Sequence, residues 1–525
     1  MKLWSEFQSF EKNIKGKKSK LLNNVFSFDI ETSSVFILDG KIFPSLNYKD
    51  LDKKTQERCI FQSFMYIWQF SIDDVVYFGR TWRDFQKFLD KLDLFAPEKK
   101  IVFVHNLSFE FQFLHGHFNF HDVMARKSRH VMKAYFDDYN IELRCSYMMS
   151  NVALAVLPKV YKLDVQKMSG DLDYSKIRTP ETPLTSEELK YCENDCLVVY
   201  KYILRELETY NSVDKIPMTF TGHVRKELKK ITYKDWKYKK QTRCAINTNP
   251  IIYNRLLEAF QGGYTHSNWF YTGEVLHDVD SYDFTSSYPF VMVSEKYPMT
   301  EFKPCKLRKA EEMLKGFAYI IRVKFKNIKS KYLNNFISMS KCRHIRGATY
   351  DNGRIVKALE LEMTLTDIDF KIILEAYSGT YEILESYYSF YKYLPEKFYK
   401  FILEKYIEKT KLKNVEGREV EYALSKNMFN SLYGMSVTNT IRDEVIFDNE
   451  TLWSESELDN ISIVMKLQEE KQKGFLSFSW RSMGHSLCKE KFDSKYNSSR
   501  QIYCLLWYRF NQSSPRIWQK YYWFI

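Results

Sequence analysis

The sequence predicts a multidomain protein of mixed α/β and α+β class. Its 525 residues are enough for two to four domains. Residues 24–33 alternate apolar and polar side chains, which predicts a strand with one buried face. Thr185 and Glu188 form a Thr-x-x-Glu capping pattern, so we expect a helix from there through Tyr202. Helical patterns return in the second half, from Glu396 to Tyr433.

The composition is that of a folded protein with an excess of basic charge. Lys and Arg number 79 against 66 Asp and Glu, a net charge of +13, and 45% of residues are hydrophobic, which excludes a disordered or fibrous chain. The basic excess suits a nucleic acid partner, and a generally Lys-rich composition explains it equally well. Of the nine cysteines, only Cys192 and Cys196 are close together in the sequence, and no second pair completes a zinc site. The N-terminus is too polar for a signal peptide and no apolar run has membrane length, so we expect a cytoplasmic protein without a membrane partner.

Two carboxylates on the first predicted strand are candidate metal ligands. Asp29 and Glu31 are two residues apart, so a strand places them on one face. Carboxylates this close repel unless a cation lies between them, and hard oxygen ligands suit Mg²⁺ or Mn²⁺. A solvated strand face is the alternative that a single D-x-E leaves open.

Two further groups point to the same chemistry. Asn106 lies at the end of the apolar run 101–107, which we expect to be another strand, and Glu110 follows that run. Tyr191 and Asp195 are four residues apart on the capped helix and share a face. A hydroxyl and a carboxylate on one face can orient a water and hold a metal.

A second constellation lies in the middle of the chain. Asp283 ends an alternating segment and is followed by a turn containing Ser286, Tyr288 and Pro289. A carboxylate at a strand end can bind a phosphate-bound metal.

Further along, Lys426, Asn430 and Tyr433 form one stripe of a helix that ends near Gly434. Lys supplies charge for phosphates, and Tyr supplies a face for stacking on a base. We expect Phe429 and Leu432 to reach the core.

The first set of residues, in this order, resembles the three exonuclease motifs of the DnaQ-like, RNase H-like 3′–5′ proofreading domain of family B DNA polymerases. The resemblance implies metal ligands at Asp29, Glu31 and Asp195, and DNA binding at Asn106. It also implies catalytic roles for Tyr191 and Glu110. The family has Asp at the end of the second motif, where this chain has Glu110. The Glu side chain is one methylene longer than that of Asp.

The second set resembles motifs A and B of the same family. Residues 283–289 resemble D-x-x-S-L-Y-P with Ser287 in place of Leu, and residues 426–434 fit K-x-x-x-N-S-x-Y-G. The resemblance implies that Asp283 is the catalytic metal ligand of an incomplete right-hand palm and fingers. It implies nucleotide-binding roles for a further set of residues: Ser286, Tyr288, Lys426, Asn430 and Tyr433. Gly434 would bind DNA, and Phe260-Gln261-Gly262-Gly263 resembles a template-binding Y-x-G-G loop, which implies DNA contacts for Gly262 and Gly263.

The motif spacing resembles the protein-primed subgroup of phages and linear plasmids. Motifs A and B are 426 − 283 = 143 residues apart, which leaves room for an insertion like the TPR1 subdomain. The subgroup starts synthesis on a terminal protein, so the resemblance implies this partner besides template-primer DNA. We expect these domains: 1–215 exonuclease, 216–300 start of the palm with motif A, 301–395 TPR1-like insertion, 396–440 fingers with motif B, 441–479 palm remainder and 480–525 an aberrant tail.

The tail departs from the family because no Y-x-D-T-D-S motif C follows Gly434. If the codons for residues 504–511 are read one base forward, they can encode V-Y-Y-G-T-D-S-I, which contains the T-D-S of motif C. With the same shift, the codons for residues 480–492 can encode G-V-x-W-V-T-A-Y-A-R-K-N-L, which resembles the helix that precedes motif C in the family. We therefore interpret the tail as frameshifted near Ser479, or truncated.

The sequence thus predicts a protein-primed DNA-directed DNA polymerase with 3′–5′ exonuclease proofreading. It would use pairs of Mg²⁺ or Mn²⁺ ions and dNTP substrates. Because half of the palm metal site is missing, an exonuclease with a defective polymerase site is the first alternative. A non-catalytic single-stranded DNA binder is the second.

Overall fold

The computed structural model divides the chain into two compact units. The first comprises residues 1–223, 417–424 and 443–457, and the second comprises 224–416, 425–442 and 458–525. Residues 1–14, 20–165, 172–173, 175–264, 273–275, 277, 286–332, 335–436, 438–439 and 441–496 are described, the last six by their backbone alone. Asp283 and most of the tail lie outside these residues. No helix of the described residues is long and apolar enough to cross a membrane.

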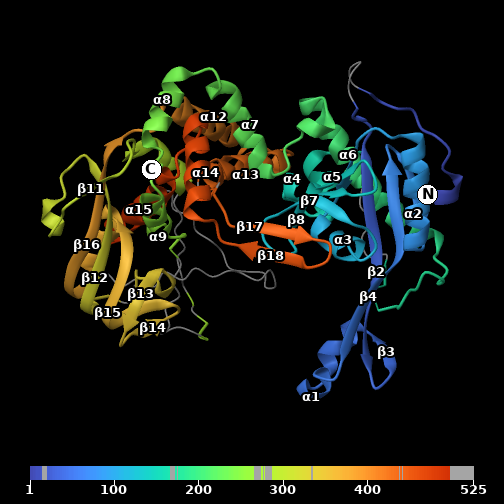
Figure 1. The fold of residues 1–525 in the computed structure, drawn as a ribbon, viewed down its shortest axis with the longest axis horizontal. Coiled ribbons are helices and arrows are strands. Elements are labelled where there is room, and N and C mark those ends of the chain that lie inside the picture. Colours follow the sequence, from blue (N-terminus) through green and yellow to red (C-terminus); the bar gives the residue numbers. More distant parts are fainter. Residues whose placement is uncertain are drawn as a thin grey trace. The chain divides into compact units, whose positions relative to one another are not determined.

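The first unit is built on a nine-stranded mixed sheet in the order β1-β5-β4-β2-β6-β9-β8-β7, with β3 paired to β2 (Figure 1). Its central strands β2, β6 and β9 run parallel, and the other pairings are antiparallel except β1 with β5. The strands are β1 Lys2–Leu3, β2 Phe26–Leu38, β3 Lys41–Pro44, β4 Ile60–Ile72, β5 Val75–Gly79, β6 Lys100–Val104, β7 Phe120–Ala125, β8 Val131–Phe136 and β9 Ile141–Cys145.

Helices cover both faces of this sheet. The helices of this unit are α1 Lys53–Gln56, α2 Trp82–Phe95, α3 Leu107–Leu114, α4 Ser146–Ser150, α5 Leu157–Tyr161 and α6 Ser186–Tyr210. One core joins α2 and α3 to Phe26, Phe28 and Ile30 of β2, and another joins α6 to Ile101 and Phe103 of β6. The alternation along β2 therefore gives the strand two different faces. The apolar side chains lie under α2, and the polar side chains lie under α6.

The predicted strand and capped helix are confirmed. The alternating residues lie in β2, which continues beyond the predicted end to Leu38. The Thr185 hydroxyl accepts the Glu188 N–H at 3.2 Å, and the Glu188 carboxylate accepts the Thr185 N–H at 2.8 Å. This reciprocal cap satisfies two backbone donors and fixes where α6 begins.

The second unit is built on a seven-stranded antiparallel sheet, in the order β10-β16-β12-β15-β13, with β11 on β16 and β14 on β15. The strands are β10 Tyr297–Pro298, β11 Lys303–Cys305, β12 Phe317–Ser330, β13 Cys342–Arg346, β14 Thr349–Asp351, β15 Arg354–Thr366 and β16 Tyr377–Lys392. The helices are α8 Trp236–Ala245, α9 Pro250–Ala259, α10 Ser287–Ser294, α11 Asp367–Ala376, α12 Glu396–Leu412, α14 Asn460–Lys473 and α15 Ser479–Tyr496. Two helices, α7 Phe220–Thr232 and α13 Glu419–Ser436, cross the boundary between the units.

A late segment of the chain folds onto the first unit. Residues 443–457 contain the hairpin of β17 Glu444–Asp448 and β18 Leu452–Ser456, and they are grouped with the first unit although α13 precedes them in sequence. Figure 1 shows this hairpin, drawn in orange, with β7 beside it.

Helix α15 contains the beginning of the tail that the sequence marks as aberrant. Its described side chains include Trp480, Met483 and Leu487, each at most 5% exposed and part of the core of the second unit. Up to residue 490, the described part of this tail is therefore packed as an ordinary core helix.

Candidate nuclease and polymerase sites

Three carboxylates predicted as metal ligands meet on one face of the first sheet. One carboxylate oxygen from each of Asp29, Glu31 and Asp195 lies within 4.8 Å of the other two. Asp29 and Glu31 follow Ser27 along the face of β2 under α6, where the Ser27 hydroxyl donates to the Cys196 carbonyl at 3.1 Å. That contact holds the Asp195 turn of α6 against the strand. The prediction that these residues gather is confirmed.

The electrostatics of this cluster favour a cation. Glu31 and Asp195 are 8% and 4% exposed, so little water screens their mutual repulsion. Burial, followed by the charges of Glu31, Asp29 and Asp195, raises the pKa of the Cys192 thiol on α6. Clustered carboxylates of this kind match the oxygen ligands that Mg²⁺ and Mn²⁺ prefer. The residues present therefore fit a divalent metal ion.

Glu110 lies beside the cluster rather than within it. It is 3% exposed, on the first turn of α3, and its Oε2 atom is buried without a hydrogen-bond partner. Burial, followed by the charge of Glu31, raises the pKa of Glu110 well above its ordinary value. The carboxyl is thus close enough to sense Glu31, and a cation in the site would relieve the cost of ionising it.

The two remaining residues predicted for this site lie on the same elements. Asn106 precedes α3, is exposed, and has the left-handed conformation with φ of 74°, which Asn tolerates better than most residues. Tyr191 is one turn before Asp195 on α6 and is 7% exposed. Tyr191 therefore lies on the helix that carries Asp195, and Asn106 lies at the start of the helix that carries Glu110.

In the second unit, the residues after Asp283 pack against the predicted motif B helix. The ring of Tyr288 on α10 stacks on that of Tyr433 on α13, with centroids 4.1 Å apart and planes at 15°. Gly263 passes close to Tyr288, because a Cβ added there would lie 3.2 Å from the phenol oxygen. Burial raises the pKa of Tyr288 to about 12. Gly263 of the F-Q-G-G segment, Tyr288 and Tyr433 of the predicted motif B therefore lie together.

The motif B stripe divides into exposed and buried parts. Lys426 and Asn430 are exposed, as a role toward a ligand requires, whereas Tyr433 is 9% exposed and faces Tyr288. Phe429 and Leu432 are buried as expected. Gly434 follows Tyr433 on α13 and is half-buried, and Gly262 is exposed in the loop after α9.

Sequence reasoning missed a buried lysine at this site. Lys409 on α12 donates a hydrogen bond from Nζ to the Ser286 hydroxyl at 2.7 Å. Its ammonium group also lies over the rings of Tyr406 and Phe429, at 4.8 and 4.6 Å from their centroids. Burial, followed by nearby Lys413 and Lys426, lowers its pKa. Its contacts join residues more than 100 positions apart, so spacing along the chain gives no signal for it.

Sequence reasoning also missed His485 on α15. The imidazole lies 5.0 Å from the rings of both Tyr288 and Phe260, and its Nδ1 atom is hydrogen bonded to the Tyr433 hydroxyl. Burial and the charges of Lys489 and Arg481 lower its pKa to about 4, so it is neutral at pH 7. The described tail therefore contributes directly to the packing around Tyr288.

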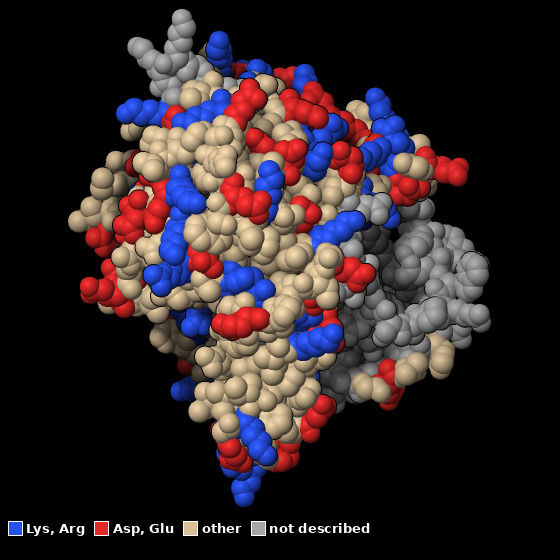
Figure 2. Space-filling view, turned by 90° about the vertical axis from the view of Figure 1, so that its right-hand side faces the viewer, with Lys and Arg blue, Asp and Glu red and all other residues tan. Residues whose placement is uncertain are grey.

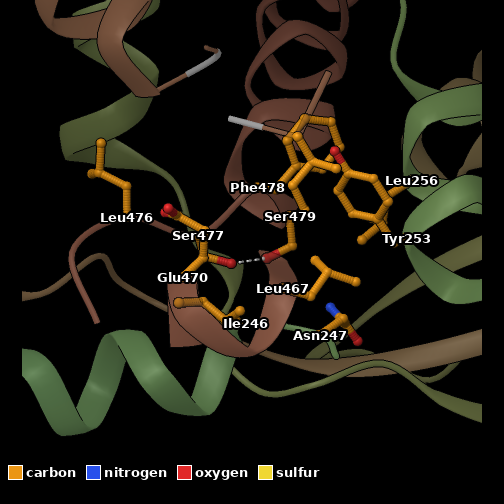
Figure 3. Close-up of a pocket in the computed structure, with 11 residues that line it drawn as sticks. Ile246, Asn247, Tyr253, Leu256, Leu467, Glu470, Leu476, Ser477, Phe478 and Ser479 are labelled. Carbon is orange, nitrogen blue, oxygen red and sulfur yellow. Dashed lines mark hydrogen bonds between the residues drawn. The ribbon is translucent and has the colours of Figure 1, made fainter. Parts of the chain in front are cut away.

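A small cavity elsewhere in the second unit is too small for a nucleotide. It lies among α8, α9, α14 and the segment before α15, and Ser477 and Ser479 are hydrogen bonded at its wall (Figure 3). Its volume of about 30 Å³ suits one or two waters. On the outer face drawn in Figure 2, Lys and Arg are interspersed with Asp and Glu. The basic excess thus forms no continuous stripe on that face.

Comparisons with known proteins find a matching family model and similar sequences. A family model described as DNA polymerase type B, organellar and viral, matches residues 169–505, more than half of the chain. DNA polymerases of Bacillus phages Nf and B103 are 26% and 25% identical over 274 residues, 52% of this chain. That match covers 45% of each relative, so the chain spans about half the length of these relatives.

Solved structures show the same fold. Phi29 DNA polymerase in an orthorhombic crystal form superposes with a TM-score of 0.63 at 16% identity, covering 92% of this chain and 79% of that one. Its complex with primer-template DNA and incoming nucleotide substrates gives 0.55 at 17% identity, covering 86% and 75%. At these identities the likeness concerns the fold.

Proposed function

Because the chain belongs to the organellar and viral type B DNA polymerases, we propose that it is a DNA polymerase whose first unit removes nucleotides from DNA 3′ ends. The observation that carries the nuclease part is the cluster of Asp29, Glu31 and Asp195. Two of these like charges, Glu31 and Asp195, are buried, and they lower the stability of the fold unless they serve to bind a cation.

Within the nuclease site, each residue has a proposed task. Asp29, Glu31 and Asp195 hold Mg²⁺ or Mn²⁺, as a pair of ions in the full site. When bound, the metal lowers the pKa of a water and neutralises charge on the phosphate. Tyr191 orients the attacking water, the ionised Glu110 carboxylate accepts the proton that this water loses, and Asn106 holds the 3′-terminal nucleotide.

The proposed polymerase site uses the residues around Tyr288. Lys426, Asn430 and Lys409 bind the triphosphate of an incoming dNTP, because two are exposed on one helix stripe and the third contacts Ser286. Tyr288, held by its stack on Tyr433, limits space at the sugar. The loop at Gly262 and Gly263 binds template-primer DNA together with Gly434. Asp283, the proposed metal ligand, lies outside the described residues.

We further propose that synthesis starts on a terminal protein. The support is the separation of 143 positions from Asp283 to Lys426, which leaves room for an insertion of the size used by protein-primed enzymes. Residues 301–395 are the proposed contact for that protein.

A nuclease with a defective polymerase site is the second candidate. It is favoured by the missing motif C, for which we propose a frame change near Ser479. The nucleotide sequence tests this point: a shifted frame that stops early or lacks T-D-S contradicts it.

The nuclease proposal is tested with the full chain, Mg²⁺ and a 5′-labelled single-stranded oligonucleotide. Asp29→Ala and Asp195→Ala are each expected to reduce 3′-end degradation to background, because each removes a metal ligand, while DNA binding by a mobility shift stays within about twofold. Loss of DNA binding in both variants would contradict these roles.

Extension of a primed template by the same preparations separates the candidates. Extension together with degradation supports the polymerase, and degradation alone supports the nuclease. Binding without either activity would support a single-stranded DNA binder.

A further inference from the structure

The β17–β18 hairpin pairs with the edge of the nuclease sheet through a side chain. Strand β7 is the last strand in that sheet, and Phe120 is its first residue. The Phe120 N–H donates to Asn449 Oδ1 at 2.9 Å, and Asn449 Nδ2 donates to the Phe120 carbonyl at 3.2 Å. One amide at the hairpin turn thus satisfies both polar groups that an edge strand leaves open at this residue.

A second contact is made by two aromatic side chains of the hairpin. Phe447 and Trp453 are directly opposite each other in the β17–β18 register, with ring centroids 5.1 Å apart. Both pack on Phe111 of α3, at 5.0 and 6.1 Å between centroids. Phe111 is 0% exposed, so these rings form part of its enclosure.

Helix α3 depends on such contacts because it is short. It has eight residues, and helices of this length are marginal without tertiary packing. Phe111 is anchored by Phe120 at 4.9 Å inside the sheet and by the hairpin rings. Glu110, the residue before Phe111, lies beside Glu31 of the carboxylate cluster, and Asn106 begins the same helix.

We infer that the β17–β18 hairpin is a positioning element of the nuclease site, which holds α3 and thereby places Glu110 and Asn106. The inference rests on the proposed nuclease function of the first unit. Phe447 is 447 − 110 = 337 residues from Glu110, and only residues 437–443 separate the hairpin from α13, which carries Lys426. The nuclease site is thus completed by a segment that follows the nucleotide-binding helix in the chain.

The test uses the full chain with Phe447→Ala and Trp453→Ala combined. Single-stranded DNA degradation is measured at saturating and limiting substrate, together with hydrogen exchange of the α3 amides. We expect kcat to fall by about tenfold or more, since small displacements of catalytic groups are costly. We also expect faster exchange in α3 and unchanged exchange in β2.

Matched variants separate positioning from general damage. Ile446→Ala removes a side chain that is 47% exposed between the two inward residues of β17, and it should leave kcat and exchange unchanged. Trp453→Phe keeps an aromatic ring against Phe111 and should restore most of kcat in the presence of Phe447.

An unchanged kcat with α3 still protected in the double variant would overturn the inference. If the double variant fails to fold, Asn449→Ala, which removes only the two bonds to Phe120, replaces it with the same readouts. A wild-type chain that degrades no DNA would contradict the proposed function instead. In that case the exchange of α3 alone decides whether the hairpin holds the helix.

Discussion

At the scale of single residues, burial decides which carboxylates are costly. Glu206 on α6 is 9% exposed, and burial raises its pKa to about 7 from an ordinary value of 4.5. The His223 Nδ1 atom lies 3.7 Å from its Oε2 atom. Unlike the cluster of Asp29, Glu31 and Asp195, this carboxyl has no role in the proposed chemistry.

The raised pKa of Glu206 predicts a pH-dependent loss of stability. The folded state binds the proton more tightly than the unfolded state, so stability from this group is full below about pH 4.5 and is lost as pH rises through about 7. Glu206→Gln removes this dependence. The free energy of unfolding of the variant relative to wild type, measured by urea at pH 5 and pH 8, should therefore rise with pH by up to about 3 kcal/mol. An equal difference at both pH values would contradict the assignment.

At the scale of elements, α15 is held by a buried ion pair as well as by its apolar face. Lys489 Nζ lies 2.5 Å from Asp369 Oδ1 on α11, and the Ser486 hydroxyl donates to Asp369 Oδ2 at 2.5 Å. Lys489 also donates to Gln261 Oε1 at 3.2 Å, next to Gly262. The pair thus joins α15, α11 and the predicted template-binding loop.

Breaking this pair should destabilise the chain strongly. Lys489→Met leaves the Asp369 carboxylate buried without its cation and is expected to cost about 3–5 kcal/mol in the free energy of unfolding. Lys489→Arg keeps the charge and should cost much less. Urea unfolding of both variants measures the difference, and a Met variant as stable as wild type would contradict the role of the pair.

The same helix bears on the proposed frame change. The shifted frame can encode Trp at 483, Tyr at 487 and Arg at 489, where the chain has Met483, Leu487 and Lys489. Both frames therefore supply large side chains for the core and a cation for Asp369. The bases of the gene distinguish the two frames.

Elements with strong local signals were predictable from the sequence, and contacts between distant segments were not. The alternation in β2 and the Thr185 cap of α6 act within a few residues, so they predicted both elements and the meeting of Asp29 with Asp195. Lys409, His485 and the docking of Phe447 on Phe111 depend on tertiary packing, for which spacing along the chain carries no information.

At the scale of the whole molecule, two units with separate cores carry the two groups of residues proposed as sites. The first gathers carboxylates on the face of a mixed sheet, and the second arranges Tyr288, Tyr433 and Lys409 around a loop of glycines. Family membership and fold agree with this division. The central claim is that the carboxylates of the first unit form a divalent metal site.

Anomalous diffraction from crystals of the full chain grown with Mn²⁺ tests that claim most directly. The account predicts a manganese peak within coordinating distance of Asp29, Glu31 and Asp195, which is lost in Asp29→Ala. The crystals are grown at a Mn²⁺ concentration that saturates DNA degradation. If the three side chains are then ordered but hold no ion, the claim of a metal site is contradicted.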